Sequence, residues 1–187
     1  SDAGYGIACD TSGNVYVTGY TASQGAGNND IIIVKYNSSG AIQWQRALGG
    51  TLTESARRVV CDLSGNIYVV GLISSQGAGS NDIALIKYNS SGSILWQRAI
   101  GSASPESGYG LECDSSGNVY IAGSPGVIVK FNASGVLQWQ KNILVSGNIS
   151  INSNYIFLGY GGYVYRYGIN GDYLDTTNLT VTNTSLT

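Results

Sequence analysis

The chain has 187 residues, of which 43% are hydrophobic and only 11% are charged, and its formal net charge is −2. This length suffices for one sizeable hydrophobic core, and the lack of a basic stripe argues against nucleic acid as a partner. The longest apolar runs are too short to span a bilayer, so we expect no membrane insertion. The chain contains no histidine, which excludes Ser-His-Asp and Cys-His catalytic arrangements and the usual zinc ligands.

The sequence is built from repeats. Cys9, Cys61 and Cys113 lie 52 residues apart, and each begins the same run, Cys-Asp-x-Ser-Gly-Asn-Val/Ile-Tyr-Val/Ile. A fixed period of about 50 residues is typical of propellers and arrays, because one such unit cannot bury its apolar faces alone. We therefore expect successive copies of one structural unit.

The first unit contains four short apolar runs, at residues 5–9, 15–19, 31–36 and 42–47. These runs are rich in β-branched and aromatic residues and are bounded by Gly, Asn, Asp and Ser, which predicts strands. The intervening residues 10–14 and 37–40 have the composition of tight hairpin turns. Residues 31–34 are apolar at every position, so both faces of their sheet must be covered. The pattern predicts an all-β propeller of four-stranded antiparallel blades with almost no helix.

Later units repeat this pattern with progressive loss. The fourth unit is degenerate. Its residues 154–159 align with residues 118–123, and Asp175 occupies the position at which the earlier units have tryptophan. We expect about four blades, at residues 1–50, 51–102, 103–144 and 145–175. Residues 176–187 would form an extended, β-prone tail that links to a further domain or pairs with the edge of another subunit.

Several segments of the repeat are diagnostic: Ser-Gly-Asn-Val-Tyr-Val-Thr-Gly at residues 12–19, Gly-Asn-Asn-Asp-Ile at 27–31, Val-Lys-Tyr-Asn at 34–37, and Trp44. In these segments the chain resembles the SBBP family of bacterial and archaeal β-propeller repeats, whose name stands for seven-bladed β-propeller. The resemblance spans roughly residues 1–141. It implies a scaffold of the kind found in surface, secreted and virion proteins, and it implies no particular activity.

The blade count departs from that family. Seven blades of this period would need about twice the present length. Either four blades close a small ring, or the chain is part of a longer protein whose N-terminal blades are absent. The lack of methionine and the opening directly at a first strand favour a fragment or a processed product.

The three cysteines occupy one repeat position. Equivalent positions in neighbouring blades lie about 10 Å apart, which is beyond the reach of a disulfide. We therefore expect free cysteines that serve as small buried hydrophobic residues. Without a histidine partner they are poor candidates for a nucleophile.

The long connection at residues 22–30 and its copy at residues 74–82 are the first candidates for ligand binding, because they are too long for tight hairpins. Their amide and carboxylate side chains suit sugar hydroxyls or a protein partner. The candidate residues are Gln24, Asn28, Asn29, Asp30, Gln76, Asn81 and Asp82. Alternatively, these loops are flexible glycine-rich connections in which the two aspartates only cap the backbone.

Most charged residues recur at the same position in every unit, as structural ion pairs and turn caps do. Five charges break this pattern: Arg57, Arg58, Glu112, Asp172 and Asp175.

The repeated acids offer two weaker possibilities. Asp10 begins an alternation of oxygen ligands that resembles a calcium loop, but glycine stands at the fourth place and no closing glutamate follows, so turn capping is favoured. Asp2, Glu54 and Glu106 could ring one mouth of a channel, although solvated carboxylates or partners of the repeated lysines are favoured. We expect no metal and no other cofactor.

Six Asn-x-Ser/Thr sequences are possible glycosylation sites. Three occupy the same hairpin loop in successive units, where turn chemistry explains asparagine equally well. The sites are Asn37, Asn89, Asn132, Asn148, Asn178 and Asn183.

Tyrosines are concentrated in the last unit. Tyr163, Tyr165 and Tyr167 have the period of two that places them on one sheet face. An exposed face could stack on sugar rings or on a partner. An internal face, which we favour, would replace the Ile and Val packing of earlier units.

These observations support two functional hypotheses. The leading one is a non-enzymatic structural or recognition module that binds glycan or protein through blade loops. It would be exposed on a virion, as a tail-fibre or spike segment for host attachment, or on a cell surface, with other subunits of the assembly as further partners. The alternative is a propeller-mouth enzyme, a glycan lyase or hydrolase that uses Asp, Glu and Tyr and requires two carboxyl groups within about 10 Å in one pocket.

Overall fold

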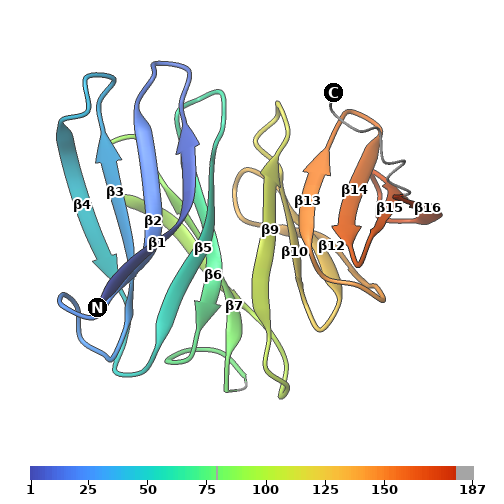
Figure 1. Ribbon diagram of the computed structural model, residues 1–187, viewed down its shortest axis with the longest axis horizontal. Helices are drawn as coiled ribbons and strands as arrows, with labels where there is room; N and C mark the ends of the chain where they lie inside the picture. Colours follow the sequence, from blue (N-terminus) through green and yellow to red (C-terminus); the bar gives the residue numbers. More distant parts are fainter. Residues whose placement is uncertain (79, 180–187) are drawn as a thin grey trace, which may run out of the picture.

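The computed structural model describes residues 1–78 and 80–179 and confirms an all-β architecture (Figure 1). The described residues form sixteen strands and no helix, so none of them belongs to a helix that could cross a membrane. Consecutive strands are neighbours in four four-stranded antiparallel sheets. The strands are β1 (Asp2–Cys9), β2 (Val15–Thr21), β3 (Asp30–Tyr36), β4 (Ile42–Leu48), β5 (Glu54–Cys61), β6 (Ile67–Ile73), β7 (Asp82–Tyr88), β8 (Ile94–Ile100), β9 (Ser107–Cys113), β10 (Val119–Ser124), β11 (Val127–Phe131), β12 (Leu137–Asn142), β13 (Asn148–Ile151), β14 (Tyr155–Tyr160), β15 (Tyr163–Gly168) and β16 (Tyr173–Asn178).

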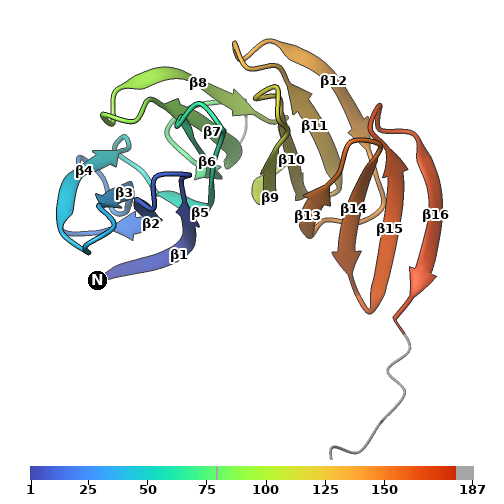
Figure 2. The same cartoon turned by 90° about the horizontal axis from the view of Figure 1, so that it is seen from above.

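Each sheet is one blade, so blades 1 to 4 comprise β1–β4, β5–β8, β9–β12 and β13–β16. The blades form an arc in which the first strand of each blade lies on the concave side and the last strand on the convex side (Figure 2). Blades 1 and 4 are the two ends of this arc (Figure 2). β16 continues to Asn178, so residues 176–178 of the expected tail complete blade 4, and residues 180–187 lie outside the described residues.

The repeated Asp-x-Ser-Gly-Asn sequence forms the turn between the first two strands of blades 1 to 3. In blade 1 the Asp10 carboxylate accepts hydrogen bonds from the backbone N–H groups of Ser12 and Asn14, both at 2.9 Å. The aspartates of blades 2 and 3 repeat these bonds. These aspartates therefore cap turns, as the favoured interpretation of the sequence proposes.

Three hydrophobic clusters fill the space between successive blades. In blade 2, Ile67 and Val69 pack toward blade 1, whereas Tyr68 and Leu85 pack toward blade 3. Because successive strand residues point to opposite faces of the sheet, a blade between two others is buried on both faces. This requirement explains why every residue of β7 is buried.

Polar contacts that we call the Lys-Trp-Arg clamp join blades 1 and 2 to the blades that follow them. In blade 1, Lys35 Nζ and Trp44 Nε1 donate to the backbone carbonyl of Ser90, at 3.0 and 3.2 Å. Arg46 Nε donates to the carbonyl of Gly92 at 3.3 Å. The acceptors lie in the turn between the third and fourth strands of the next blade. Blade 2 repeats the clamp through Lys87, Trp96 and Arg98, which donate to the carbonyls of Ala133 and Gly135.

The contact between blades 3 and 4 departs from this pattern. A Cβ on Gly171 would lie 3.0 Å from the Trp139 ring, so tryptophan still covers the turn of the next blade. The polar contact, however, is an ion pair between Lys141 and Asp172 at 3.2 Å. Within blade 4, Asp175 replaces the tryptophan and pairs with Arg166, so this blade has no tryptophan with which to form a clamp.

The second strand of blade 4 lies one residue out of the alignment expected from the sequence. Val119 pairs with Phe131 in blade 3, and Ile156 rather than Tyr155 takes the equivalent place opposite Tyr167. The cause is the hairpin turn. Two residues, both glycines with positive φ, separate the paired ends of β14 and β15, whereas three residues separate the paired ends of β10 and β11. As a result Ile156 is buried against blade 3.

The tyrosines of β15 face blade 3, as the favoured interpretation expects. Tyr167 is buried in the cluster between blades 3 and 4, and Tyr165 packs against the same cluster. Tyr163, at the start of the strand, is exposed.

Candidate binding site on the concave face

The first strands of the blades converge on the concave side of the arc (Figure 2). Residues of β1, β5, β9 and β13 contribute there to the lining of a hollow of about 500 Å³. We call it the axial hollow. None of the described residues that line it carries a carboxylate, so both of its charged side chains are positive. All four blades contribute to the lining, which consists of Tyr5, Arg57, Arg58, Tyr109, Ser124, Ser146, Gly147, Asn148, Gly159 and Tyr160.

Three of the lining residues, Tyr5, Arg57 and Tyr109, occupy one position of the repeat. At each of them the register between the first and second strands of the blade shifts by one residue. These residues are therefore the extra residues of β-bulges, which re-aim side chains and are frequent next to active sites. The same distortion in three blades turns three side chains toward the axial hollow.

The sequence around the bulge differs between blades. Blades 1 and 3 read Gly-Tyr-Gly, at residues 4–6 and 108–110, whereas blade 2 reads Ala-Arg-Arg, at residues 56–58. A Cβ on Gly6 would lie 3.0 Å from the Cα of Arg58, which is tighter than an ordinary contact. Glycine in blade 1 thus lets β1 approach β5 at the point where blade 2 carries its two arginines.

The two arginines have different partners. Arg57 lies over the ring of Tyr109, with its guanidinium carbon 5.0 Å from the ring centroid, which is a cation–π contact. Its buried Nε has no hydrogen-bond partner among the described residues. Arg58 donates from Nη2 to Oδ1 of Asn148 in blade 4, at 2.7 Å.

Neither arginine forms an ion pair with a described carboxylate. The axial hollow therefore contains two guanidinium groups whose charge no described side chain balances. Guanidinium groups form strong, geometrically specific hydrogen bonds with carboxylates and other oxyanions. The arrangement is chemically suited to an anionic ligand.

The aspartates at the ends of the two long loops are buried. Asp30 is buried and accepts hydrogen bonds from the backbone N–H groups of Ala26 and Gly27, at 3.4 and 3.3 Å. Asp82 is buried in the copy. The contacts of Asp30 agree with the alternative in which this aspartate caps the loop backbone.

The remaining loop candidates are divided between contact with the next blade and solvent. The carbonyl of Asn29 accepts from the N–H of Glu54, and that of Asn81 accepts from the N–H of Glu106, each at 2.8 Å. Each long loop is therefore tied to the first strand of the following blade. None of the seven loop candidates lines the axial hollow, and the exposed ones are Gln24, Asn28 and Gln76.

The acids that precede the first strands of blades 2 and 3 are buried. Glu54 accepts hydrogen bonds from the N–H groups of Gly50 and Ser75, at 2.8 and 3.1 Å. Glu106 accepts from the hydroxyl of Ser102 at 2.5 Å. The expectation of solvated carboxylates is therefore wrong for these two residues, because they satisfy polar groups in the loops between blades.

The cysteines differ in exposure. All three are free, but Cys9 is exposed and Cys61 and Cys113 are only half-buried, so the expectation of fully buried thiols is wrong. The Sγ of Cys113 lies 3.4 Å from the carbonyl oxygen of Cys61 in the preceding blade. Cys9 is exposed because none of the described blades precedes blade 1. Burial raises the pKa of Cys61 to about 12 and that of Cys113 to about 11.

The asparagines of the three hairpin sequons take part in turns. The Oδ1 atom of Asn37 accepts hydrogen bonds from the N–H groups two and four residues further along the chain, at 3.1 and 2.8 Å. Asn89 and Asn132 repeat these bonds. Turn chemistry thus accounts for asparagine at these positions. Asn178 is exposed in β16, and Asn183 lies outside the described residues.

The axial hollow was not among the sites predicted from the sequence, although a signal for it was present. Arg57 and Arg58 are two of the five charged residues that do not recur at the same position in the other units. The fold that the units share does not explain such residues. The sequence could not show that position 57 is bulged, and the bulge is what turns its side chain into the hollow.

Comparison with known proteins shows that the start of the chain is similar to one family of repeats. Residues 1–25 match the family model SBBP, described as a β-propeller repeat. In an alignment 92 residues long that covers 43% of the chain, the sequence is 32% identical to the regulatory protein FlaEY of Caulobacter vibrioides. This match covers 10% of that protein, so the chain spans about a tenth of its length.

Two solved structures resemble the chain in fold. BamB from Moraxella catarrhalis has a TM-score of 0.62 and 16% identity over 95% of this chain and 50% of its own. A protein of unknown function from Bacteroides caccae has a TM-score of 0.59 and 18% identity over 89% of this chain and 59% of its own. At these identities the likeness shows the fold alone. The chain thus has the β-propeller fold, and its residues 1–25 match the SBBP repeat.

Proposed function

We propose that this chain is a non-enzymatic recognition and structural module of a virion or cell surface, and that it binds an acidic segment of a partner protein in the axial hollow. The β-propeller fold supports a protein-binding or structural role in general. Free cysteines suit a virion protein assembled in a reducing compartment. The Asn-x-Ser/Thr sequences suit a cell surface.

The observation that carries the proposal is the pair of guanidinium groups without a described counter-charge. A buried polar group that lacks a partner is unfavourable, and the Nε of Arg57 is such a group. A carboxylate that enters the hollow would accept this hydrogen bond and balance the charge. Bonds of this kind are the stronger ones in proteins.

The aromatic residues of the hollow favour a protein partner. Tyr5 and Tyr160 are each about half exposed at its edge. Tyrosine and arginine are enriched among the residues that contribute most to protein–protein binding. The volume of about 500 Å³ lies within the range of about 300–1,000 Å³ that is usual for pockets, so the hollow could take a few side chains of an extended segment.

Binding of labelled model ligands tests this function. A fluorescent hexaglutamate peptide should bind the full chain, and the matched hexaglutamine peptide should not. The double variant R57A/R58A should bind hexaglutamate about tenfold more weakly or worse, because a hydrogen bond to a charged group contributes roughly 1.5–3 kcal/mol. The long-loop variant N28A/N29A is the control and should bind as the unaltered chain does.

Other outcomes would contradict parts of the proposal. Equal binding by R57A/R58A and the unaltered chain would reject the axial hollow as the site. Loss of binding in N28A/N29A would place recognition on the long loops instead. Tighter binding of a hexaglucuronate oligosaccharide than of hexaglutamate, with the same dependence on the two arginines, would replace the protein partner by an anionic glycan.

A further inference from the structure

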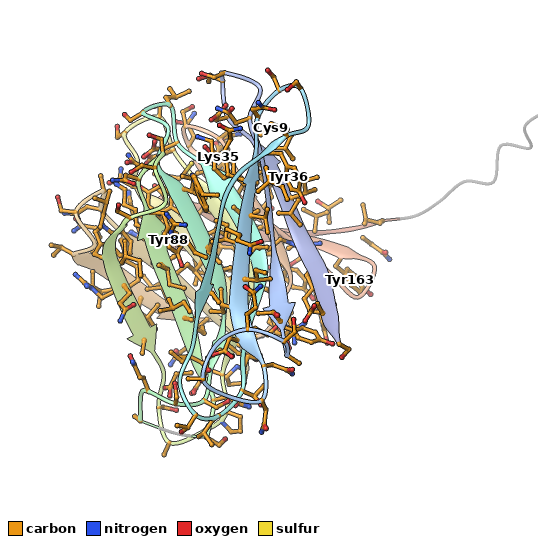
Figure 3. All side chains as sticks on the ribbon, turned by 90° about the vertical axis from the view of Figure 1, so that its left-hand side faces the viewer. Cys9, Lys35, Tyr36, Tyr88 and Tyr163 are labelled. Carbon is orange, nitrogen blue, oxygen red and sulfur yellow. The ribbon has the colours of Figure 1, made fainter. Side chains whose placement is uncertain are left out.

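In blades 1 and 2 the acid at the start of the first strand accepts hydrogen bonds from the long loop of the same blade. The Asp2 carboxylate accepts from the backbone N–H of Ala22 at 3.0 Å. Its repeat equivalent, Glu54, accepts from the N–H of Ser75 at 3.1 Å. These loops lie at the end of the molecule opposite Cys9 (Figure 3). The long loop is therefore the regular partner of this acid.

Blade 3 lacks the long loop. Residues 74–81 separate β6 from β7, whereas only Pro125 and Gly126 separate β10 from β11, and proline has no N–H group to donate. The equivalent acid of blade 3, Glu106, accepts a hydrogen bond on Oε1 from the hydroxyl of Ser102, at 2.5 Å. Its Oε2 atom is buried and has no hydrogen-bond partner among the described residues. The deletion has thus left half of this carboxylate without its donor.

A hollow of about 470 Å³ lies beside Glu106, and we call it the loop hollow. Glu106 carries the only charge among the described residues that line it. The carboxylate of Asp82, which is also buried, lies behind Gly101 of the lining. The loop hollow therefore has negative charge and no cationic side chain in its described lining. Its lining includes Ile83, Ile100, Gly101, Pro125, Gly126 and Ile143.

The matching place between blades 1 and 2 is almost filled. A hollow there is lined by Leu48 and Gly49, which are the repeat equivalents of Ile100 and Gly101, and its volume is only about 30 Å³. Ser75 of the long loop is part of its lining. Loss of the loop in blade 3 thus has two consequences at one place, since it opens a hollow and removes the donor to the acid.

We propose that the loop hollow binds a primary ammonium group on a short aliphatic chain, which replaces the missing donor to Glu106. A buried polar atom without a partner is unfavourable, and a charged donor bonds to a carboxylate more strongly than a neutral donor does. The terminal torsion of glutamate has a broad range, so the carboxylate of Glu106 can turn Oε2 toward the hollow that it lines.

The rest of the lining suits such a group. An ammonium is a compact cation with three donors, and the side-chain oxygens of Gln140 and Asn142 are acceptors in the same lining. The aliphatic side chains of Ile100 and Ile143 can cover the methylene chain. None of the lining residues is shared with the axial hollow. This proposal is therefore independent of the function proposed for that hollow.

Titration with n-butylammonium chloride, followed by nuclear magnetic resonance of the backbone amides, tests the site. In the full chain we expect saturable shifts at Ser102, Glu106 and Gly126. Glu106→Gln keeps the shape of the side chain but removes its charge, and should raise the Kd about tenfold or more. Glu54→Gln is the same change at the equivalent acid, which the loop already satisfies, and should leave the Kd unchanged. Butanol, which lacks the charge, should bind much more weakly than butylammonium.

A second variant restores the loop. A copy of residues 73–83 in place of Pro125 and Gly126 gives blade 3 the long loop of blade 2. This graft should abolish butylammonium binding, because the loop fills the hollow and supplies its own donor to Glu106.

Several results would overturn the proposal. These are undiminished binding by the graft, equal weakening by Glu106→Gln and Glu54→Gln, or binding of butanol as tight as that of butylammonium. The unaltered chain decides even where a variant fails to fold, since no saturable shift, or shifts confined to other blades, would reject the site. An acetylated and amidated Gly-Gly-Lys-Gly-Gly peptide distinguishes the sources of the ammonium group. Tighter binding of the peptide than of butylammonium would assign the site to a lysine side chain of a partner, and weaker binding to a free alkylamine.

Discussion

The interface between blades 2 and 3 and the interface between blades 3 and 4 meet the same packing requirement with different chemistry. In the first, Trp96 and two cationic side chains donate hydrogen bonds to carbonyls of the neighbouring turn. In the second, the polar contact is the ion pair of Lys141 and Asp172, whose side chains are 43% and 60% exposed. Exposed ion pairs contribute little to stability, so blade 4 is held mainly by its apolar cluster.

Blade 3 also presents a less apolar face to blade 4. Ala8 and Val60 pack against the clusters between earlier blades, and Glu112 occupies the same repeat position in blade 3. Burial raises the pKa of Glu112, which shows that its charged form is disfavoured there. Side chains at a few repeat positions therefore determine the stability of each interface between blades. We expect blade 4 to separate from its neighbour before the other blades do.

The largest expected effect is at the clamp of blade 2. Trp96→Ala removes the indole that packs on the turn of blade 3 and the hydrogen bond from its Nε1 atom. We expect a loss of roughly 3 kcal/mol in the free energy of unfolding, measured by urea denaturation. Trp96→Phe keeps most of the packing and should lose about 1 kcal/mol. Equal effects of the two substitutions would mean that packing contributes little to the clamp.

The second prediction contrasts Cys9 in blade 1, which is exposed, with Cys61 and Cys113, which are half-buried. The pKa values of about 12 for Cys61 and about 11 for Cys113 leave almost no thiolate at neutral pH. Cys9 is exposed and should be alkylated first, by a factor of about 100 or more in rate. Peptide mapping after brief iodoacetamide treatment measures this order. Comparable rates at the three cysteines would contradict the burial of the other two.

The third prediction concerns Glu112 and pH. Burial raises the pKa of Glu112 above the usual 4.5. The carboxyl group of Glu112 therefore stays protonated to a higher pH in the folded chain than in the unfolded chain. The contribution of protonated Glu112 to stability is complete below the pKa of Glu112 in the unfolded chain. This contribution is lost as the pH rises through the pKa of Glu112 in the folded chain. Glu112→Gln should raise the free energy of unfolding at neutral pH and change it little below pH 4. A stabilisation of equal size at both pH values would contradict a titration effect.

The smallest effect is expected at the ion pair between blades 3 and 4. Asp172→Ala should cost less than about 0.5 kcal/mol, because both side chains are largely solvated. Urea denaturation at low and high ionic strength would measure this loss, which should shrink as salt is added. A loss in the free energy of unfolding as large as that of Trp96→Ala would contradict this account. It would show that the ion pair stabilises its interface as strongly as the clamp stabilises the interface between blades 2 and 3.

Much of the fold could be predicted because its signals are local. Asp10 and Asn37 sit in turns whose hydrogen bonds stay within a few residues of sequence, and the apolar runs determine which segments are strands. The repeat then predicts that neighbouring sheets must cover one another. The confirmed architecture of four-stranded blades depends on nothing more distant than these patterns.

The predictions that failed concern residues whose surroundings depend on other blades or on the register of a hairpin, which the repeat pattern does not specify. Cys9 has the same sequence surroundings as Cys61, and it is exposed because no described blade lies on its face. The slip of β14 follows from the Gly161-Gly162 turn, which shifts the pairing by one residue. The axial hollow exists because a bulge at Arg57 and residues from other blades converge, and periodicity alone contains no information about that convergence.

Native-state hydrogen exchange, read blade by blade, tests the central comparison most directly. We predict that the amides of β14 and β15 exchange through an opening of lower free energy than the amides of β6, β7, β10 and β11. Asp172→Ala should leave this difference nearly unchanged, and Trp96→Ala should reduce it by loosening blade 3. A single exchange free energy for all four blades would contradict the account, because it would mean that the clamped and unclamped interfaces are equally strong.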